Sequence, residues 1–213
     1  RCIADELFTV CSIFVNPTQF NNRSDFEKYP NTIEQDINKL ELAGCELLFL
    51  PSEDEIYPNG FEAPHYELGF IETVFEGEFR PGHFQGVCMV VHRLLDIVNP
   101  DIMYLGQKDY QQCMVIQKLI DITGINTKLV ICDTLRETDG LAMSSRNMRL
   151  TPAQRALAPA IFKELKRLKS NLGKETLTQL IKSAFNSLES LGFRVDYFDV
   201  ADARTLAPIT NWN

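Results

Sequence analysis

Strand-type and helix-type segments alternate along most of this 213-residue chain, and this alternation limits its fold more than any other feature. The segments follow one another at residues 7–15, 31–43, 46–50, 84–98, 102–105, 110–124 and 126–132. The first of them is nearly all apolar, as expected of a parallel strand that is covered on both faces. The order predicts an α/β fold, with a Rossmann-like parallel sheet and helices on its faces.

The pattern changes after residue 149. Thr151 is a favourable N-cap and is followed by proline at the first helical position. Two amphipathic helices and a strand are predicted next, at residues 152–170, 176–191 and 194–200. We therefore expect two domains, a nucleotide-binding domain over residues 1–149 and a smaller α+β domain over residues 150–213.

Composition narrows the classes of partner. With 21 Lys and Arg against 29 Asp and Glu, the net charge is -8, which argues against a broad nucleic-acid surface and favours small molecules. No apolar run reaches the roughly 20 residues that span a bilayer, so no membrane partner is expected. The six cysteines are scattered without a CxxC pair, and we expect reduced thiols, four of them in the core, in a cytoplasmic protein.

Two polar segments have the chemistry of a phosphate site. Gly106 follows a predicted strand and lets a ligand approach the backbone, Lys108 supplies a positive charge, and Asp109 can hold Mg²⁺ or orient the lysine. Further on, Ser144 to Arg146 offer two hydroxyls and a forked cation. The alternatives are an exposed turn in which Asp109 caps the next helix, and a polar loop.

Amides and histidines are the other candidate groups. Asn16 and Gln19 follow the first strand and can orient a small polar substrate, although the same residues suit a simple turn. His83 begins a predicted helix and is either functional or a cap. His92 lies inside the apolar helix and is expected to be a satisfied core histidine.

Five segments, taken in order, resemble the pantoate–β-alanine ligase family of the nucleotidyltransferase superfamily. They lie at residues 14–20, 55–58, 80–87, 106–112 and 139–147, and the resemblance covers essentially the whole chain. It implies a two-step reaction, in which ATP and pantoate form pantoyl-adenylate and β-alanine then displaces AMP. Because the carboxylate of pantoate is already ionised, the first step needs alignment and charge neutralisation rather than a general base.

The resemblance also implies roles for individual residues and a homodimer. Those expected to contact ATP are Gly106, Gln107, Lys108, Asp109, Leu135, Met143, Ser144, Ser145 and Arg146, with Leu135 and Met143 near the adenine. Catalysis is assigned to Lys108, Ser144, Ser145 and Arg146. Pantoate is assigned to Gln19 and Gln112, β-alanine to Asn16 and Gln19, and Mg²⁺ to Asp36 and Asp109.

The sequence departs from the family pattern at both ends. The HxGH segment, which belongs before the strand at residues 7–15, is absent, and the C-terminal domain lacks the strands that usually complete it. We therefore expect a fragment whose activity is weak, since losing a phosphate-positioning pair costs several kcal/mol of transition-state stabilisation. Two rivals are a non-catalytic binding module and a related nucleotidyltransferase, which would need a basic pocket in place of Gln19 and Gln112.

Overall fold

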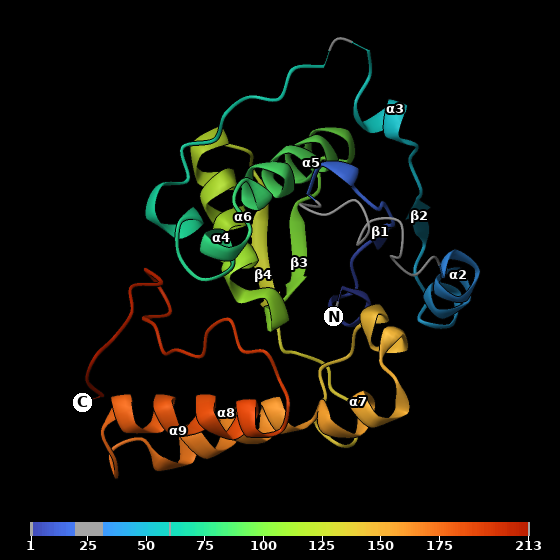
Figure 1. The fold of residues 1–213 in the computed structure, drawn as a ribbon. Helices are drawn as coiled ribbons and strands as arrows, with labels where there is room; N and C mark the ends of the chain where they lie inside the picture. Colours follow the sequence, from blue (N-terminus) through green and yellow to red (C-terminus); the bar gives the residue numbers. More distant parts are fainter. Residues whose placement is uncertain (1, 20–31, 60, 213) are drawn as a thin grey trace. The chain divides into compact units, whose positions relative to one another are not determined.

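The chain divides into two compact units. The structure is a computed structural model that describes residues 2–19, 32–59 and 61–212 (Figure 1). The units are Arg1–Asp133 and Thr134–Asn213. The boundary precedes residue 149, where the sequence pattern changes, because residues 134–149 are bonded to the helices that follow them. Arg155 Nη1 donates to Asp139 Oδ2 at 2.6 Å, and the Arg136 guanidinium stacks on the Phe162 ring at 3.7 Å.

Parallel strands form the first unit, as the alternating pattern predicts. Strand β1 (Val10–Ser12) pairs with β2 (Leu47–Phe49), and helix α2 (Ile33–Leu42) lies between them in the chain. Strand β3 (Ile102–Gly106) pairs with β4 (Lys128–Cys132). The described residues thus contain two separate two-stranded parallel sheets. The α/β class is confirmed, although β1 is shorter than the predicted strand at residues 7–15.

Two helices bury the core of the first unit against the second sheet. Helix α5 (His83–Val98) contributes Val87 and Leu95, and helix α6 (Tyr110–Thr123) contributes Ile116 and Leu119. Fully burying a side chain of this size stabilises the fold by about 1.5–3 kcal/mol. Met103, Leu105 and Leu129 of β3 and β4 pack against the same cluster. The sheet and both helices therefore form one packed body, which fixes the place where β3 meets α6 (Figure 1).

Shorter elements connect these parts of the first unit. They are the helices α3 (Glu53–Ile56) and α4 (Glu76–Phe79) and the 3₁₀ turns η1 (Ile3–Asp5), η2 (Pro17–Gln19), η3 (Gly69–Glu72) and η4 (Gln107–Asp109). Cys88 and Cys113 are buried as expected, and burial raises the pKa of the Cys88 thiol to about 12. Cys11 and Cys132 were also expected in the core but are only half-buried.

Helices dominate the second unit. They are α7 (Pro152–Leu157), α8 (Ala160–Asn171) and α9 (Leu177–Ser190), preceded by the turn η5 (Ser145–Arg149). Thr151 and Thr176 each form a capping box, which confirms the predicted starts of two helices. The single helix predicted at residues 152–170 is wrong, because this range is divided into α7 and α8. The predicted strand at residues 194–200 is wrong. That segment is irregular, and the nearest pairing is an isolated bridge between Ala201 and Pro208.

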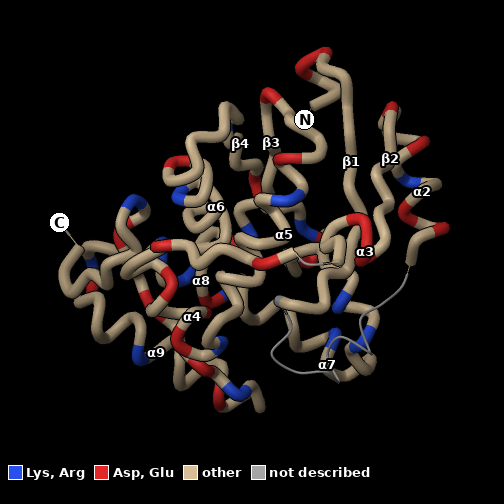
Figure 2. The backbone as a smooth tube through the Cα atoms, turned by 90° about the horizontal axis from the view of Figure 1, so that it is seen from above, with Lys and Arg blue, Asp and Glu red and all other residues tan. Residues whose placement is uncertain are grey.

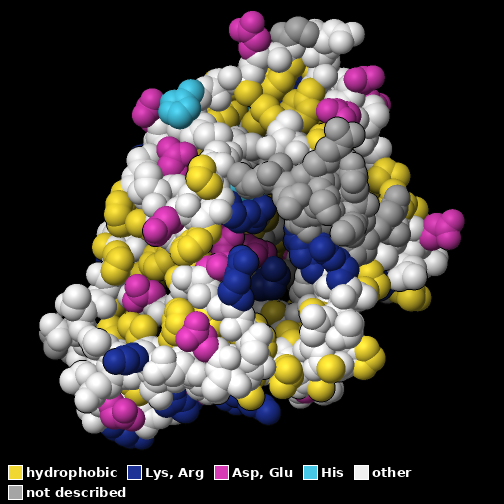
Figure 3. Space-filling view, viewed as in Figure 1, with side chains coloured by type: hydrophobic (Ala, Val, Ile, Leu, Met, Phe, Trp, Pro, Cys, Tyr) yellow, Lys and Arg dark blue, Asp and Glu magenta, His cyan; other side chains and the backbone are white. Residues whose placement is uncertain are grey.

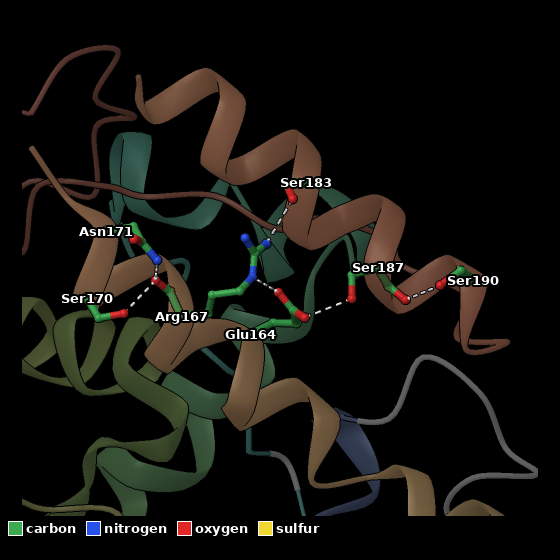
Figure 4. A network of polar contacts seen from close by, with 7 residues as sticks. All are labelled: Glu164, Arg167, Ser170, Asn171, Ser183, Ser187 and Ser190. Carbon is green, nitrogen blue, oxygen red and sulfur yellow. Dashed lines mark hydrogen bonds and ion pairs between the residues drawn. The ribbon is translucent and has the colours of Figure 1, made fainter. Parts of the chain in front are cut away.

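Polar contacts join α8 to α9 (Figure 4). Glu164 Oε2 accepts from Arg167 Nε at 2.7 Å, and its Oε1 accepts from Ser187 Oγ at 2.8 Å. Arg167 Nη2 also donates to Ser183 Oγ at 3.1 Å. Leu168 of α8 and Leu180 of α9 are buried. The two helices are therefore held together by apolar burial and by a charged pair that reaches across to α9.

Charges of both signs are interspersed along the backbone. Helix α2, for example, has Glu34 and Asp36 in its first turn and Lys39 in its last (Figure 2). The face drawn in Figure 3 likewise carries acidic as well as basic side chains, with hydrophobic ones among them. In the described part of the chain, no helix is long and apolar enough to cross a membrane.

Candidate functional site

Gly106 ends β3 at a position where the fold itself does not require glycine. Its φ of -81° and ψ of 130° are open to any residue, and an added Cβ would meet no atom within 4 Å. Gly106 pairs with Cys132, so it lies at the carboxyl ends of two parallel strands, where α/β sheets bind ligands. The space beside Gly106 would let a ligand approach the backbone closely.

Lys108 and Asp109 lie between β3 and α6 and pair with each other. Lys108 Nζ is 3.1 Å from Asp109 Oδ1 and 3.0 Å from Oδ2, and the two side chains are 40% and 59% exposed. The expectation that Asp109 caps α6 is wrong, because it holds the N-cap position without a side-chain cap bond. An ion pair this exposed contributes only about 0–1 kcal/mol, so a phosphate can replace the carboxylate at little cost.

Gln111 and Gln112 are neighbours with opposite environments. Gln111 is buried, and its Nε2 donates to the carbonyl oxygens of Ile71 and Val74 at 2.8 and 2.7 Å. Its Oε1 accepts from the backbone N–H of Glu76 at 3.2 Å. Gln112 is half-buried and forms no side-chain hydrogen bond within the described residues. Gln111 therefore holds the segment before α5, whereas Gln112 has its amide available for a ligand.

Asn16 is the most enclosed polar side chain among the described residues of the predicted site. It is 1% exposed, and its amide joins Thr18, Tyr57 and Gly86 through hydrogen bonds. Burial raises the pKa of the Tyr57 hydroxyl above its ordinary value, so this group is protonated and donates at neutral pH. The Gln19 backbone closes the turn η2, but its side chain lies outside the described residues.

The predicted metal ligands have protein partners. Asp36 Oδ2 accepts from Thr32 Oγ1 at 2.7 Å, and its Oδ1 lies 3.5 Å from Lys39 Nζ. Asp109 faces Lys108 as described above. Over the residues described, no group of three or more His, Cys, Asp or Glu side chains is placed to hold a metal ion. An ion at this site would therefore rely on oxygens of its ligand for most of its coordination.

In the second unit, a short antiparallel pairing exposes two apolar side chains. Arg136 bridges to Ala142, and the Met143 N–H donates to the Leu135 carbonyl at 3.0 Å. Leu135 and Met143 are thus opposite each other, and they are 74% and 48% exposed. Opposite residues of an antiparallel pair point to the same face. They form an exposed apolar platform of the kind that an adenine ring can cover.

Packing beneath the loop holds this platform in place. The turn contains Gly140 at φ +95°, and a Cβ there would lie 2.6 Å from a ring carbon of Phe162. Arg136 stacks on the same ring and donates from Nη1 to the Gly140 carbonyl at 3.2 Å. Here, in contrast to Gly106, both backbone conformation and packing require glycine.

The Ser-Ser-Arg segment follows the platform directly. Ser144 is the N-cap of η5, and its Oγ accepts from the Arg146 N–H at 3.3 Å. Asn147 Nδ2 donates to the Ala142 carbonyl at 3.0 Å and ties the turn to the antiparallel pairing. Ser145 is half-buried and Arg146 is exposed. Local hydrogen bonds thus fix the turn that carries these hydroxyls and the guanidinium, directly after Met143 in the chain.

The three histidines of the first unit lie in different environments. His92 Nδ1 is 2.9 Å from the Tyr66 hydroxyl and its Nε2 is 3.8 Å from Asp96, which confirms that this histidine has polar partners, although it is half-buried and not in the core. His83 is the buried first residue of α5, and its ring lies 5.1 Å from that of Phe84. His65 is exposed.

Sequence reasoning missed two polar neighbours of the predicted site, Asp133 and Tyr57. Gln107 Nε2 donates to Asp133 Oδ1 at 3.3 Å, which links the residues that follow β3 and β4. Tyr57 reaches Asn16 from 41 positions along the chain. The parallel register of β3 and β4 is a signal that can place Asp133 beside Gln107. No local pattern pairs Tyr57 with Asn16.

Comparison with known proteins gives a consistent result. The family model described as "Pantoate-beta-alanine ligase" matches residues 1–212. A pantothenate synthetase of Porphyromonas gingivalis is 42% identical over 215 residues, which cover 100% of this chain and 75% of that protein. One from Bacteroides fragilis is 38% identical over the same share of this chain and 76% of its own length.

Solved structures agree with these relatives. The pantothenate synthetase of Thermus thermophilus superposes with a TM-score of 0.92 at 38% identity, covering 97% of this chain and 75% of that one. A pantoate-beta-alanine ligase from Francisella tularensis, complexed with beta-gamma ATP and beta-alanine, gives 0.78 at 39% identity over 93% and 74% of the two chains. The likeness thus holds in sequence and in fold.

Proposed function

The chain belongs to the pantoate–β-alanine ligase family, and we propose that it joins pantoate to β-alanine through pantoyl-adenylate. In the first step, a carboxylate oxygen of pantoate bonds to the α-phosphorus of ATP while the bond to the pyrophosphate oxygen breaks. In the second step, the β-alanine amine bonds to the acyl carbon, AMP leaves with its oxygen, and the nitrogen loses a proton. The products are pantothenate, AMP and pyrophosphate.

The observation that carries this proposal is the junction of β3 and α6. The space beside the Gly106 backbone is not filled by any other described part of the fold. Lys108 is two residues away, and its exposed ion pair with Asp109 can be replaced by one with a phosphate. A nucleotide whose phosphates displace Asp109 from Lys108 would exchange one salt bridge for another with higher charge. Such positioned charge lowers the barrier most where charge develops, which here is the departing pyrophosphate.

We propose that residues 144–146 supply a second set of groups that bind the phosphates. The hydroxyls of Ser144 and Ser145 donate to phosphate oxygens, and the Arg146 guanidinium matches them with a forked pair of N–H groups. Leu135 and Met143 form the apolar platform for the adenine. These roles follow from the family resemblance and agree with the exposure of the platform and of Arg146.

Amide side chains are proposed to hold the other two substrates. Gln112 and Gln19 bind the hydroxyl and carboxylate oxygens of pantoate, and Asn16 with Gln19 serves β-alanine. Within the described residues the amide of Gln112 forms no hydrogen bond, whereas that of Gln111 forms three, and this contrast supports the first assignment.

Mg²⁺ is proposed to bind together with the nucleotide. Asp109 and Asp36 are the carboxylates offered for it, and each already has a cationic neighbour in the structure. The residues present fit an ion that takes most of its ligands from phosphate oxygens and water and one or two from the protein. Bound there, the ion would neutralise phosphate charge.

The assembly state follows from the family resemblance. We infer a cytoplasmic homodimer, whose mass would be twice the 24.3 kDa of this chain. Light scattering on the purified protein tests this inference, and a monomeric mass at micromolar concentration would contradict it.

Pyrophosphate exchange into ATP tests the proposed reaction. We expect exchange that requires pantoate, does not require β-alanine, and is lost in Lys108→Ala. Pantothenate should form only when β-alanine is added. A folded protein that binds ATP without exchange in the presence of pantoate would refute the ligase proposal for this chain and favour a non-catalytic binding module or a related nucleotidyltransferase.

A further inference from the structure

The orientation of the Asn16 amide is settled by partners that can play only one role. The Thr18 backbone N–H, which can only donate, lies 3.3 Å from one terminal atom of the side chain, so that atom is Oδ1. The Gly86 carbonyl, which can only accept, lies 3.2 Å from the other, which is therefore Nδ2. The amide cannot be flipped without losing both bonds.

The oxygen side of this amide is fully used. Oδ1 accepts from the Tyr57 hydroxyl and the Thr18 hydroxyl, both at 2.9 Å, as well as from the Thr18 N–H. A side-chain amide has two N–H groups, and within the described residues one of those on Asn16 has a partner, the Gly86 carbonyl. The polar capacity that Asn16 retains is therefore a single N–H donor.

Helix α5 anchors both Tyr57 and Gly86. Gly86 is part of α5, and Arg93 of the same helix donates from Nε to the Ile56 carbonyl at 2.9 Å, next to Tyr57. The Tyr57 ring also lies 6.3 Å from Phe14 and 5.5 Å from Phe61, centroid to centroid. The hydroxyl thus reaches Asn16 from a rigid support, and the bonds to Thr18 extend that support to η2, which ends at Gln19.

We propose that Tyr57 is a positioning residue for the β-alanine step. Its hydroxyl is one of the donors that occupy Oδ1, so Asn16 meets a ligand only as a donor, through Nδ2. A donor suits a carboxylate oxygen of β-alanine and excludes the ammonium group, and the bond from Tyr57 fixes where that donor lies. The attacking nitrogen is thereby left unbound by Asn16. The inference rests on the proposed function, because that proposal assigns Asn16 to β-alanine.

Tyr57→Phe tests the proposal by removing the hydroxyl and keeping the ring. The two Thr18 donors still satisfy Oδ1, so the variant should fold. We expect the KM for β-alanine to rise about five- to tenfold, the effect of one lost hydrogen bond, with pyrophosphate exchange unchanged within about twofold. Tyr66→Phe is the matched control, since it removes another core hydroxyl, which is bonded to His92, and should change neither value.

A double-mutant cycle asks whether Tyr57 acts through Asn16. In an Asn16→Ala background, Tyr57→Phe should add less than about a twofold change in the KM for β-alanine. A wild-type KM for β-alanine in Tyr57→Phe, or equal losses in both half-reactions, would overturn the proposal. Failure of the ligase function is distinguishable, because the unmodified protein would then show no pantoate-dependent exchange.

Discussion

Gly106→Ala should affect the stability of the fold and the binding of ATP in opposite directions. The backbone angles of Gly106 suit alanine, and the new Cβ would meet no atom within 4 Å. Alanine at a compatible position restricts the unfolded chain, so the free energy of unfolding should be unchanged or rise by about 0.4–1 kcal/mol. In a chain of this size that corresponds to an increase in Tm of up to about 4 °C.

Binding of ATP should change in the opposite direction. The added methyl group occupies the space through which the nucleotide approaches the end of β3, and overpacking by one such group costs about 1–3 kcal/mol. Because about 1.4 kcal/mol is a factor of ten, the KM for ATP should rise about 5- to 150-fold. Pyrophosphate exchange at varied ATP, with thermal unfolding of the same samples, measures both quantities.

Gly124→Ala is the matched control at the other end of α6. Gly124 also has no atom within 4 Å of an added Cβ, but its φ is +70° at the end of the helix. Alanine there costs about 1–2 kcal/mol of backbone strain, so Tm should fall while the KM for ATP stays constant. An unchanged KM for ATP in Gly106→Ala would refute the inference that a ligand approaches this backbone.

Three further predictions concern the neighbouring glutamines Gln111 and Gln112, the ion pair of Lys108, and the ion pair of Asp139. Gln111→Ala should lower the free energy of unfolding by about 1–3 kcal/mol, since buried backbone groups lose their partners. Gln112→Ala should leave urea unfolding unchanged and raise the KM for pantoate. The reverse pattern would contradict the assignment of Gln112 to pantoate. Lys108→Ala should reduce exchange by about 10²–10³-fold with little change in Tm, because its ion pair is exposed, and a large loss of stability would indicate a structural role. The hydrogen bond from Arg155 lowers the pKa of Asp139 below its ordinary value. The Asp139 carboxylate therefore stabilises the fold above about pH 4 and loses that effect as pH falls through its folded pKa. The urea midpoints of Asp139→Asn and the unmodified protein should differ at pH 7, and the difference should shrink as the pH falls below about 4; a difference that stays constant on acidification would exclude this ion pair as its cause.

Features that depend on neighbouring residues could be predicted from the sequence. The capping boxes at Thr151 and Thr176 and the end of α6 at Gly124 follow from contacts within one helical turn. The strand at residues 194–200 was predicted wrongly, because alternating apolar residues form a strand only when another strand supplies hydrogen-bond partners. Asp109 did not cap α6, since its carboxylate meets the charge of Lys108 instead.

The sequence by itself determined the α/β class, the positions of most helices and the motifs that resemble the ligase family. The tertiary structure decided which polar side chains remain available to a ligand. Gln111 and Gln112 are identical neighbours, yet one is occupied by backbone groups some 40 positions away. Asn16 likewise accepts a hydrogen bond from Tyr57, which lies in another part of the chain. Periodicity and capping are encoded within a few residues, whereas a buried amide is satisfied by groups that only folding brings to it.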